Sequence, residues 1–158
     1  MGFLMSEIMS GPEIVDTAQM LSREAHEGQV DKSGAPYYLH PHAVANMLDE
    51  KDYVGRAVAY LHDVLEDTDV EEEDLREIFP DKIVDAVVAI TKQDKHQPYQ
   101  DYIENQVALN DIAVRVKKCD LTHNMDESRM IEKDEDYDKR MEKYKRAYAF
   151  LDELGSVQ

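Results

Sequence analysis

The chain has 158 residues, of which 18 are basic and 35 are acidic, so its formal net charge is −17 with neutral histidines. This excess of negative charge argues against nonspecific binding to nucleic acid or to an anionic membrane, because both favour basic protein surfaces. The length suits one domain with a substantial core, and no apolar run approaches the length of a membrane span.

The single cysteine, Cys119, cannot form an internal disulfide, and this predicts a protein of the reducing cytoplasm. No linker rich in Pro, Gly or Ser, no low-complexity tract and no repeat of fixed period divides the chain. We therefore expect a flexible N-terminus at residues 1–12, followed by one domain over residues 13–155.

Apolar residues recur at helical spacing along the chain, and no window alternates with the period of a strand. Ser10 and Glu13 form a capping box that opens the first helix, and Pro41 suits the first position of the second. The sequence thus predicts an all-α domain of about eight helices, which span approximately residues 10–28, 41–50, 53–67, 71–78, 81–90, 98–109, 111–124 and 137–154.

The predicted helix over residues 53–67 is the centre of the chain. Its apolar residues surround the whole helix circumference, which is typical of a buried helix. The same helix carries His62, Asp63, Glu66 and Asp67, which fall within an arc of about 140° at 100° per residue. Burying ionisable groups without partners is costly, so this flank indicates one wall of a site. An acidic loop that continues through Glu73 would explain Asp67, but it does not explain the His62–Asp63 pair between apolar neighbours.

Two further segments offer groups of the same kind. Residues 37–42 place His40 at the entrance of a helix, and residues 117–125 place Asp120 and Asn124 on one helix face at i, i+4. Two imidazoles and two carboxylates would suit Mn, Fe, Zn or Co, and they exclude a soft-metal site that needs thiolates.

These segments resemble the HD superfamily of metal-dependent phosphohydrolases, and most closely the hydrolase domain of RelA/SpoT-type alarmone enzymes and their stand-alone small relatives. The resemblance covers about residues 14–129, and it implies an all-α HD-domain helical bundle. Three motifs carry it in order, namely Ala25-His26-Glu27-Gly28-Gln29 with Lys32-Ser33-Gly34-Ala35-Pro36-Tyr37 and His40-Pro41, then Leu61-His62-Asp63-Val64-Leu65-Glu66-Asp67-Thr68, then Val116-Lys117, Asp120 and His123-Asn124-Met125.

The resemblance also implies roles for particular residues. The metal ligands would be His40, His62, Asp63 and Asp120, and the metal would be Mn²⁺, although another divalent transition metal would also suit these donors. A metal there could polarise a phosphate and lower the pKa of a bound water. Glu66 and Asp67 would position and deprotonate the attacking water, and Lys32 and Asn124 would contact the substrate.

Other polar residues have interpretations that the sequence leaves open. His26 is expected to be structural, at the end of a helix and outside the site, and His42 to face solvent or a neighbouring helix. His123 could support a metal ligand or take no part. Lys117 and Arg129 could each reach a phosphate or solvate a helix.

The sequence departs from the family at Asp31, where many alarmone hydrolases have an arginine that holds the guanine base. The leading interpretation is a guanosine-3′,5′-bis(diphosphate) 3′-pyrophosphohydrolase, with hydrolytic activity only. One alternative is an HD phosphatase acting on another nucleotide, such as a nucleoside monophosphate, an adenosine alarmone or a dinucleotide phosphate. Another is a non-enzymatic acidic interaction protein. The expected partner is a small-molecule nucleotide, with no nucleic acid and no membrane, and a homo-oligomer stays open.

Overall fold

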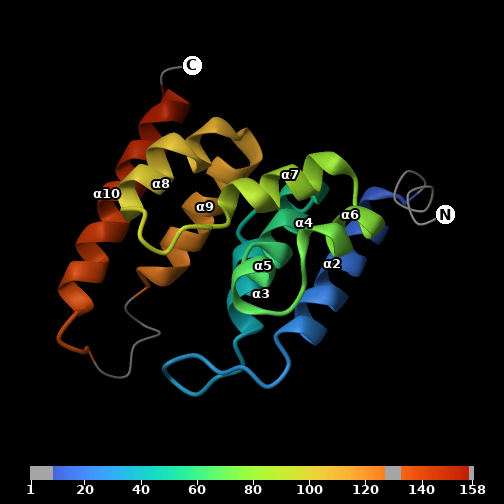
Figure 1. The fold of residues 1–158 in the computed structure, drawn as a ribbon, viewed down its shortest axis with the longest axis horizontal. Helices are drawn as coiled ribbons and strands as arrows, with labels where there is room; N and C mark the ends of the chain where they lie inside the picture. The colour runs from blue at the N-terminus through green and yellow to red at the C-terminus, as the bar shows by residue number, and fades with distance from the viewer. Residues whose placement is uncertain (1–8, 127–132, 157–158) are drawn as a thin grey trace.

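Helix α4 (Tyr53–Leu61) lies at the centre of a helical bundle and packs against α2, α3, α7 and α9 (Figure 1). The computed structural model describes residues 9–126 and 133–156. The remaining elements are α2 (Gly11–Ala25), α3 (Leu39–Asn46), α5 (Val64–Asp67), α6 (Glu72–Ile78), α7 (Asp81–Ile90), α8 (Tyr99–Asn105), the 3₁₀ helix η1 (Val107–Leu109), α9 (Asp111–Asn124) and α10 (Tyr137–Ser156).

The prediction of an all-α fold is confirmed. Within the described ranges there is no strand, and only an isolated antiparallel bridge joins Val30 to Pro36. The core that surrounds α4 is apolar, with Ala57, Val58 and Leu61 fully buried, as the predicted central helix requires. Helices α8 and α10 lie together on one side of α9, whereas α2 and α3 lie on the other side, beside α4 (Figure 1).

The central helix is not continuous over residues 53–67, as the sequence predicted, but ends at Leu61 and resumes as the one-turn helix α5. The cause lies in the His62 side chain, whose Nδ1 is 2.6 Å from the carbonyl oxygen of Ala59. The imidazole thereby hydrogen-bonds a carbonyl in the last turn of α4, and this bond takes the place of one that a continuing helix would make through its backbone. This hinge at His62 and Asp63 changes the direction in which the polar residues of α5 point.

Two other predicted boundaries also differ from the structure. The second helix begins at Leu39 rather than Pro41, and Pro41 then lies in the first turn, where a helix tolerates a residue without a backbone N–H. The helix predicted over residues 98–109 breaks at Gln106, whose side-chain amide donates to Ala89 O and Thr91 O at the end of α7.

The N-terminal end of α4 is tied to α9 by an ion pair. Asp52 accepts the N–H of Gly55 as the N-cap of α4, and its two oxygens also accept from Arg115 at 2.8 and 2.9 Å. A Cβ at position 55 would collide with the Asp52 carboxylate, so glycine is required there for this close approach. The start of α4 is thus joined to α9 at a position five residues before Asp120.

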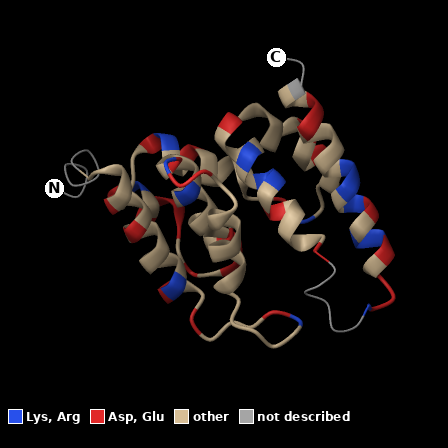
Figure 2. Ribbon diagram, turned by 180° about the vertical axis from the view of Figure 1, so that it is seen from behind, with Lys and Arg blue, Asp and Glu red and all other residues tan. Residues whose placement is uncertain are grey.

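The predicted N-cap of the first helix is confirmed, because Ser10 Oγ accepts from Glu13 N at 3.2 Å. Residues 1–8 lie outside the described residues, so the flexible N-terminus stays a prediction, and Arg129 also lies outside them. Among the described helices, none combines the length and the apolarity needed to cross a membrane. Acidic residues are spread over most helices, and basic residues are conspicuous on α9 and α10 (Figure 2).

Candidate metal and substrate site

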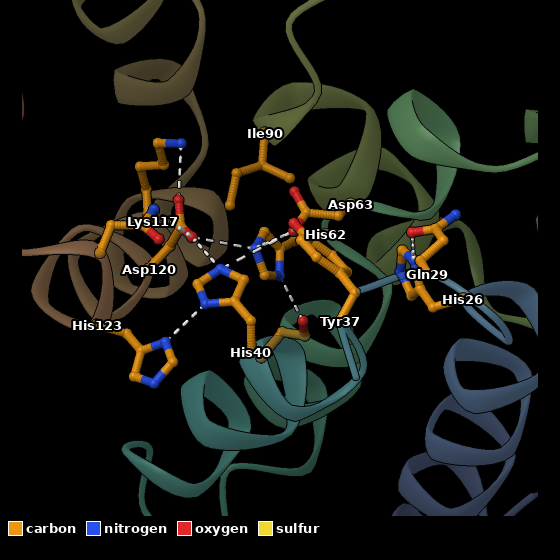
Figure 3. A network of polar contacts seen from close by, with 12 residues as sticks. His26, Gln29, Tyr37, His40, His62, Asp63, Ile90, Lys117, Asp120 and His123 are labelled. Carbon is orange, nitrogen blue, oxygen red and sulfur yellow. Dashed lines mark hydrogen bonds and ion pairs between the residues drawn. The ribbon is translucent and has the colours of Figure 1, made fainter. Parts of the chain in front are cut away.

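Four side chains that the sequence predicts as metal ligands converge between α3, the hinge after α4, and α9 (Figure 3). The Nε2 atoms of His40 and His62 lie 2.7 and 3.2 Å from Asp120 Oδ1. Asp63 Oδ2 lies 3.1 Å from His62 Nε2 and 3.9 Å from His40 Nε2. Residues separated by up to 80 positions in the chain thus share one small volume.

The spacing of these donors fits a divalent metal. Ligand atoms at right angles around an ion with bonds of about 2.1 Å lie about 3 Å apart, and the observed separations of 2.7–3.9 Å bracket that value. The ligand atoms of His40, His62 and Asp63 all lie within 4.8 Å of one another. Two imidazoles with carboxylates match the donor preferences of first-row transition metals.

The two histidines are held with Nε2 facing the centre of the cluster. Nδ1 of His62 donates to Ala59 O at 2.6 Å, which leaves the Nε2 lone pair for a ligand. Nδ1 of His40 lies 2.7 Å from Nδ1 of His123, so His123 is placed as the hydrogen-bond partner that orients His40. The sequence had left the role of His123 open.

The charges in the cluster shift the titration of its members. Burial alone would lower the pKa of His62, but the charges of Asp63 and Asp120 outweigh it and raise that pKa well above the usual value. Burial would raise the pKa of Asp120, but Lys117 and His62 hold it well below its usual range. Because a histidine ligates only when Nε2 is deprotonated, metal binding here would release a proton.

Lys117 is buried, and its ammonium group lies 2.8 Å from Asp120 Oδ2. Asn124 Nδ2 donates to the other oxygen, Oδ1, at 3.2 Å. The Asp120 carboxylate is therefore fixed on both sides by neighbours on its own helix. The sequence had left open whether Lys117 reaches a phosphate or only solvates a helix. Because Lys117 is buried, it does not solvate a helix surface.

The predicted water-activating residues, Glu66 and Asp67, lie on α5 just beyond the ligands, and both are exposed. Burial of part of each side chain, followed by the charges of neighbouring carboxylates, raises the pKa of Glu66 and of Asp67. Glu66 also borders a small cavity of about 80 Å³ together with His62 and Asp63. A carboxylate with a raised pKa at the edge of a metal cluster is suited to accept a proton from water.

On the other side of His40 lies a pocket of about 370 Å³. It contains both predicted substrate-contacting residues, Lys32 and Asn124. Its lining is completed by residues from the α2–α3 loop, α3 and α10, namely Val30, Asp31, Ser33, Tyr37, His40, Arg140, Met141 and Tyr144. A polar and aromatic pocket that opens onto a metal cluster can hold the body of a substrate while its reacting group lies at the metal.

Asp31 shapes the loop that borders this pocket. Its Oδ1 accepts from Ser33 N, Ser33 Oγ and Ala35 N at 2.9, 2.7 and 3.0 Å. Asparagine and aspartate commonly stabilise such turns. The residue that departs from the resembled family thus has a structural task in this chain.

Several residues of the site were given no role by the sequence. Tyr37 donates to Asp63 Oδ2 at 2.5 Å, and the two residues are 26 positions apart. No short-range sequence pattern predicts this contact. Arg140 and Tyr144 reach the pocket from α10. Their i, i+4 spacing was the one available signal, because it places both on one helix face.

Two histidines lie outside the cluster, as predicted. His26 is buried at the C-cap of α2, and His42 hydrogen-bonds Tyr60 of the neighbouring α4 at 2.8 Å. Tyr99 and Tyr102 have ring centroids 5.6 Å apart, and Tyr102 donates to Ile90 O, so the two rings pack against each other.

Comparison with known proteins places the chain in a family. The family model described as HD domain matches residues 18–150. The bifunctional (p)ppGpp synthase/hydrolase SpoT of Escherichia coli (strain K12) is 38% identical over 120 residues, which cover 68% of this chain and 17% of that protein. The guanosine-3′,5′-bis(diphosphate) 3′-pyrophosphohydrolase of Vibrio cholerae is 38% identical over 133 residues, covering 75% of this chain and 19% of that protein. The chain thus spans less than a fifth of the length of these relatives.

A solved structure is similar over most of both chains. It belongs to a metazoan ortholog of SpoT described as hydrolysing ppGpp and acting in starvation responses. The TM-score is 0.77 at 24% sequence identity, and the match covers 87% of this chain and 85% of that one. At this identity, the likeness supports the fold.

Proposed function

Because this chain belongs to the HD domain family, we propose that it is a metal-dependent phosphohydrolase that removes pyrophosphate from the 3′ position of guanosine-3′,5′-bis(diphosphate), here abbreviated ppGpp. The activity of the relatives from Escherichia coli and Vibrio cholerae supports this substrate. Hydrolysis of the 3′ ester consumes one water and gives GDP and pyrophosphate.

His40, His62, Asp63 and Asp120 would hold the metal, which we propose to be Mn²⁺. Bound there, the metal would supply Lewis acidity toward a phosphate oxygen and would lower the pKa of a bound water. The protein supplies the orientation of the donors. Ala59 O fixes the ring of His62, and Lys117 with Asn124 fixes the carboxylate of Asp120.

The attacking water would be positioned by the carboxylates of α5. Glu66 borders the same small cavity as His62 and Asp63, so its oxygens can receive a proton beside the reacting phosphate. Its raised pKa brings its proton affinity closer to that needed at neutral pH. Asp67, one residue further along, would assist in the same role.

The nucleoside and the remaining phosphates would occupy the pocket beside His40. Lys32 and Arg140 are its cationic residues, and Asn124 stands between this pocket and the metal ligands. Cations at this position compensate for the net charge of −17, which would otherwise repel a nucleotide carrying four phosphates. Tyr144 and Met141 offer an aromatic and an apolar surface for a base.

The convergence of two histidines and two aspartates beside a pocket that carries Lys32 and Arg140 is the observation on which the proposal rests. Purified protein with Mn²⁺ and ppGpp should release GDP and pyrophosphate in equal amounts. His62→Ala should release neither. Absence of pyrophosphate from the wild-type reaction, with the metal bound, would reject the proposal.

A second candidate, an HD phosphatase acting on another nucleotide, is favoured by one observation. Asp31 places a carboxylate at the edge of the pocket, where it cannot stack on a base as a guanidinium does. A panel of nucleoside monophosphates, adenosine alarmones and dinucleotide phosphates with Mn²⁺ separates the candidates. Faster turnover of one of these, with release of orthophosphate alone, would replace ppGpp as the substrate.

We propose a small nucleotide as the partner rather than a nucleic acid, which a chain of net charge −17 would repel. The single free cysteine, Cys119, supports a reducing cytoplasm as the working compartment. Gel filtration with light scattering would decide whether the chain works as a homo-oligomer.

A further inference from the structure

The loop at residues 29–37 is closed at its base and contacts α5 at both ends. Tyr37 N donates to Gln29 O at 2.8 Å, beside the bridge between Val30 and Pro36. From this closed base, the Tyr37 hydroxyl donates to Asp63 Oδ2 at 2.5 Å, immediately before α5. The Gln29 side chain donates from Nε2 to the backbone oxygen of Asp67 at 2.8 Å, at the last residue of α5.

His26 supports both residues of this base (Figure 3). Its Nδ1 lies 3.0 Å from Gln29 Oε1, and its ring centroid lies 5.0 Å from that of Tyr37. Gln29 Nε2 donates its N–H to Asp67 O, so Gln29 Oε1 can only accept from His26. The proton of the His26 ring is therefore assigned to Nδ1. Nε2 of this buried ring has no hydrogen-bond partner among the described residues.

Helix α5 needs such external support because it has only four residues. A single helical turn is not stable alone, since nucleation fixes several backbone angles for each hydrogen bond gained. Val64 anchors one face by burial, but Glu66 and Asp67 are exposed. The direction of these two carboxylates therefore depends on what holds the ends of the turn.

We propose that Gln29 is a positioning residue that holds the Asp67 end of α5, while Tyr37 holds the Asp63 end, so that the pocket loop and the water-activating turn are one mechanical unit. This inference rests on the proposed function for its catalytic consequence. The loop also contributes Val30, Asp31, Lys32 and Ser33 to the pocket. A substrate that fixes the loop thereby fixes the carboxylates that act on it.

Substitutions at the two ends of the turn should cause different defects. Gln29→Met keeps the length of the side chain but cannot donate to Asp67 O. It should lower kcat by about 10- to 100-fold through misplacement of the carboxylates, while KM for ppGpp and the Mn²⁺ stoichiometry stay within about twofold of wild type. Tyr37→Phe keeps the ring against His26 but removes the donor to Asp63, and should weaken Mn²⁺ binding about tenfold.

Hydrogen exchange measured by mass spectrometry gives a readout that needs no substrate. Gln29→Met should accelerate exchange in peptides that cover residues 63–68, where the N–H groups of Asp67 and Thr68 are bonded within the turn. Exchange in α9 and α10 should not change. The matched control is Gln100→Met, which removes an amide that donates to Glu104 on the same helix at 2.9 Å, and it should alter neither kcat nor exchange in α5.

Three results would overturn the inference. The first is an exchange rate in residues 63–68 of Gln29→Met that equals the wild-type rate. The second is faster exchange spread evenly over the whole chain, which would indicate a general loss of stability. The third is unchanged Mn²⁺ affinity in Tyr37→Phe. If the wild-type protein released no pyrophosphate, the proposed function would fail, but the exchange and Mn²⁺ measurements would still decide whether Gln29 and Tyr37 hold the turn.

Discussion

Replacing Lys117 with methionine tests whether its buried ion pair with Asp120 stabilises the fold. The Nζ and Oδ2 atoms are 2.8 Å apart, and the side chains are only 11% and 5% exposed. Their attraction is about 6 kcal/mol at an effective dielectric constant of about 20, and desolvation of both charges offsets part of it. Losing one partner of a buried pair costs about 3–5 kcal/mol. Because His40 and His62 still contact Asp120, we expect about 3 kcal/mol, or a fall of about 6–12 °C in Tm.

The adjacent residue, Lys118, is the matched control. Its Nζ also lies 2.8 Å from an aspartate, Asp152, but the two side chains are 28% and 60% exposed. Lys118→Met should therefore cost less than about 1 kcal/mol. Urea and thermal unfolding followed by circular dichroism, with a chelator present so that no metal replaces the lost charge, measure both variants. Equal losses in the two variants would refute the argument that burial makes the Lys117 pair strong.

The remaining predictions concern metal, water and substrate. Mn²⁺ at about one hundred times its Kd should stabilise the wild-type protein by about 2.7 kcal/mol, raising Tm by about 5–11 °C; His62→Ala should abolish this shift in a thermal melt, and a retained shift would contradict the ligand assignment. Glu66→Gln should lower kcat by about 10²- to 10⁴-fold in a pyrophosphate-release assay with the Mn²⁺-induced shift intact, and a wild-type kcat would remove Glu66 from the proposed mechanism. Asp134 lies 3.4 Å from Lys32 Nζ and 3.0 Å from Arg140 Nη1, so Asp134→Asn should free these cations and lower KM for ppGpp about two- to fivefold, less as salt is raised; a higher KM in steady-state kinetics would count against it.

The sequence predicted the fold class well because most helices have their own apolar periodicity, and Ser10, Asp52 and Asn110 cap three of them. It also drew attention to His62 and Asp63, since charged residues among buried neighbours stand out without any knowledge of tertiary structure. The hinge between α4 and α5 was missed because it depends on one side-chain hydrogen bond, from His62 to Ala59 O. The periodicity of apolar residues predicts where a helix can form, but it does not predict a hydrogen bond between a side chain and the backbone.

The pocket was less accessible to sequence reasoning than the metal ligands. Tyr37 lies 26 positions from Asp63 in the chain, and the contact between them exists only after α3 and α4 have packed together. Arg140 follows Asn124 by a long connection, so its position over the pocket depends on how α10 packs against α8 and α9. The spacing of residues within one helix does not predict how that helix is rotated about its axis relative to a distant helix.

The ion pair between Asp52 and Arg115 joins the N-terminal end of α4, opposite to His62, to α9 at a position five residues before Asp120. From Asp52 to His62 the helix is a lever about 15 Å long. A difference of about 0.2 Å in metal–ligand bond length then requires a splay of only about one degree at the pinned end. We therefore expect the ion pair to limit how far α4 and α9 separate, while a splay of this size still admits ions whose bond lengths differ by that amount.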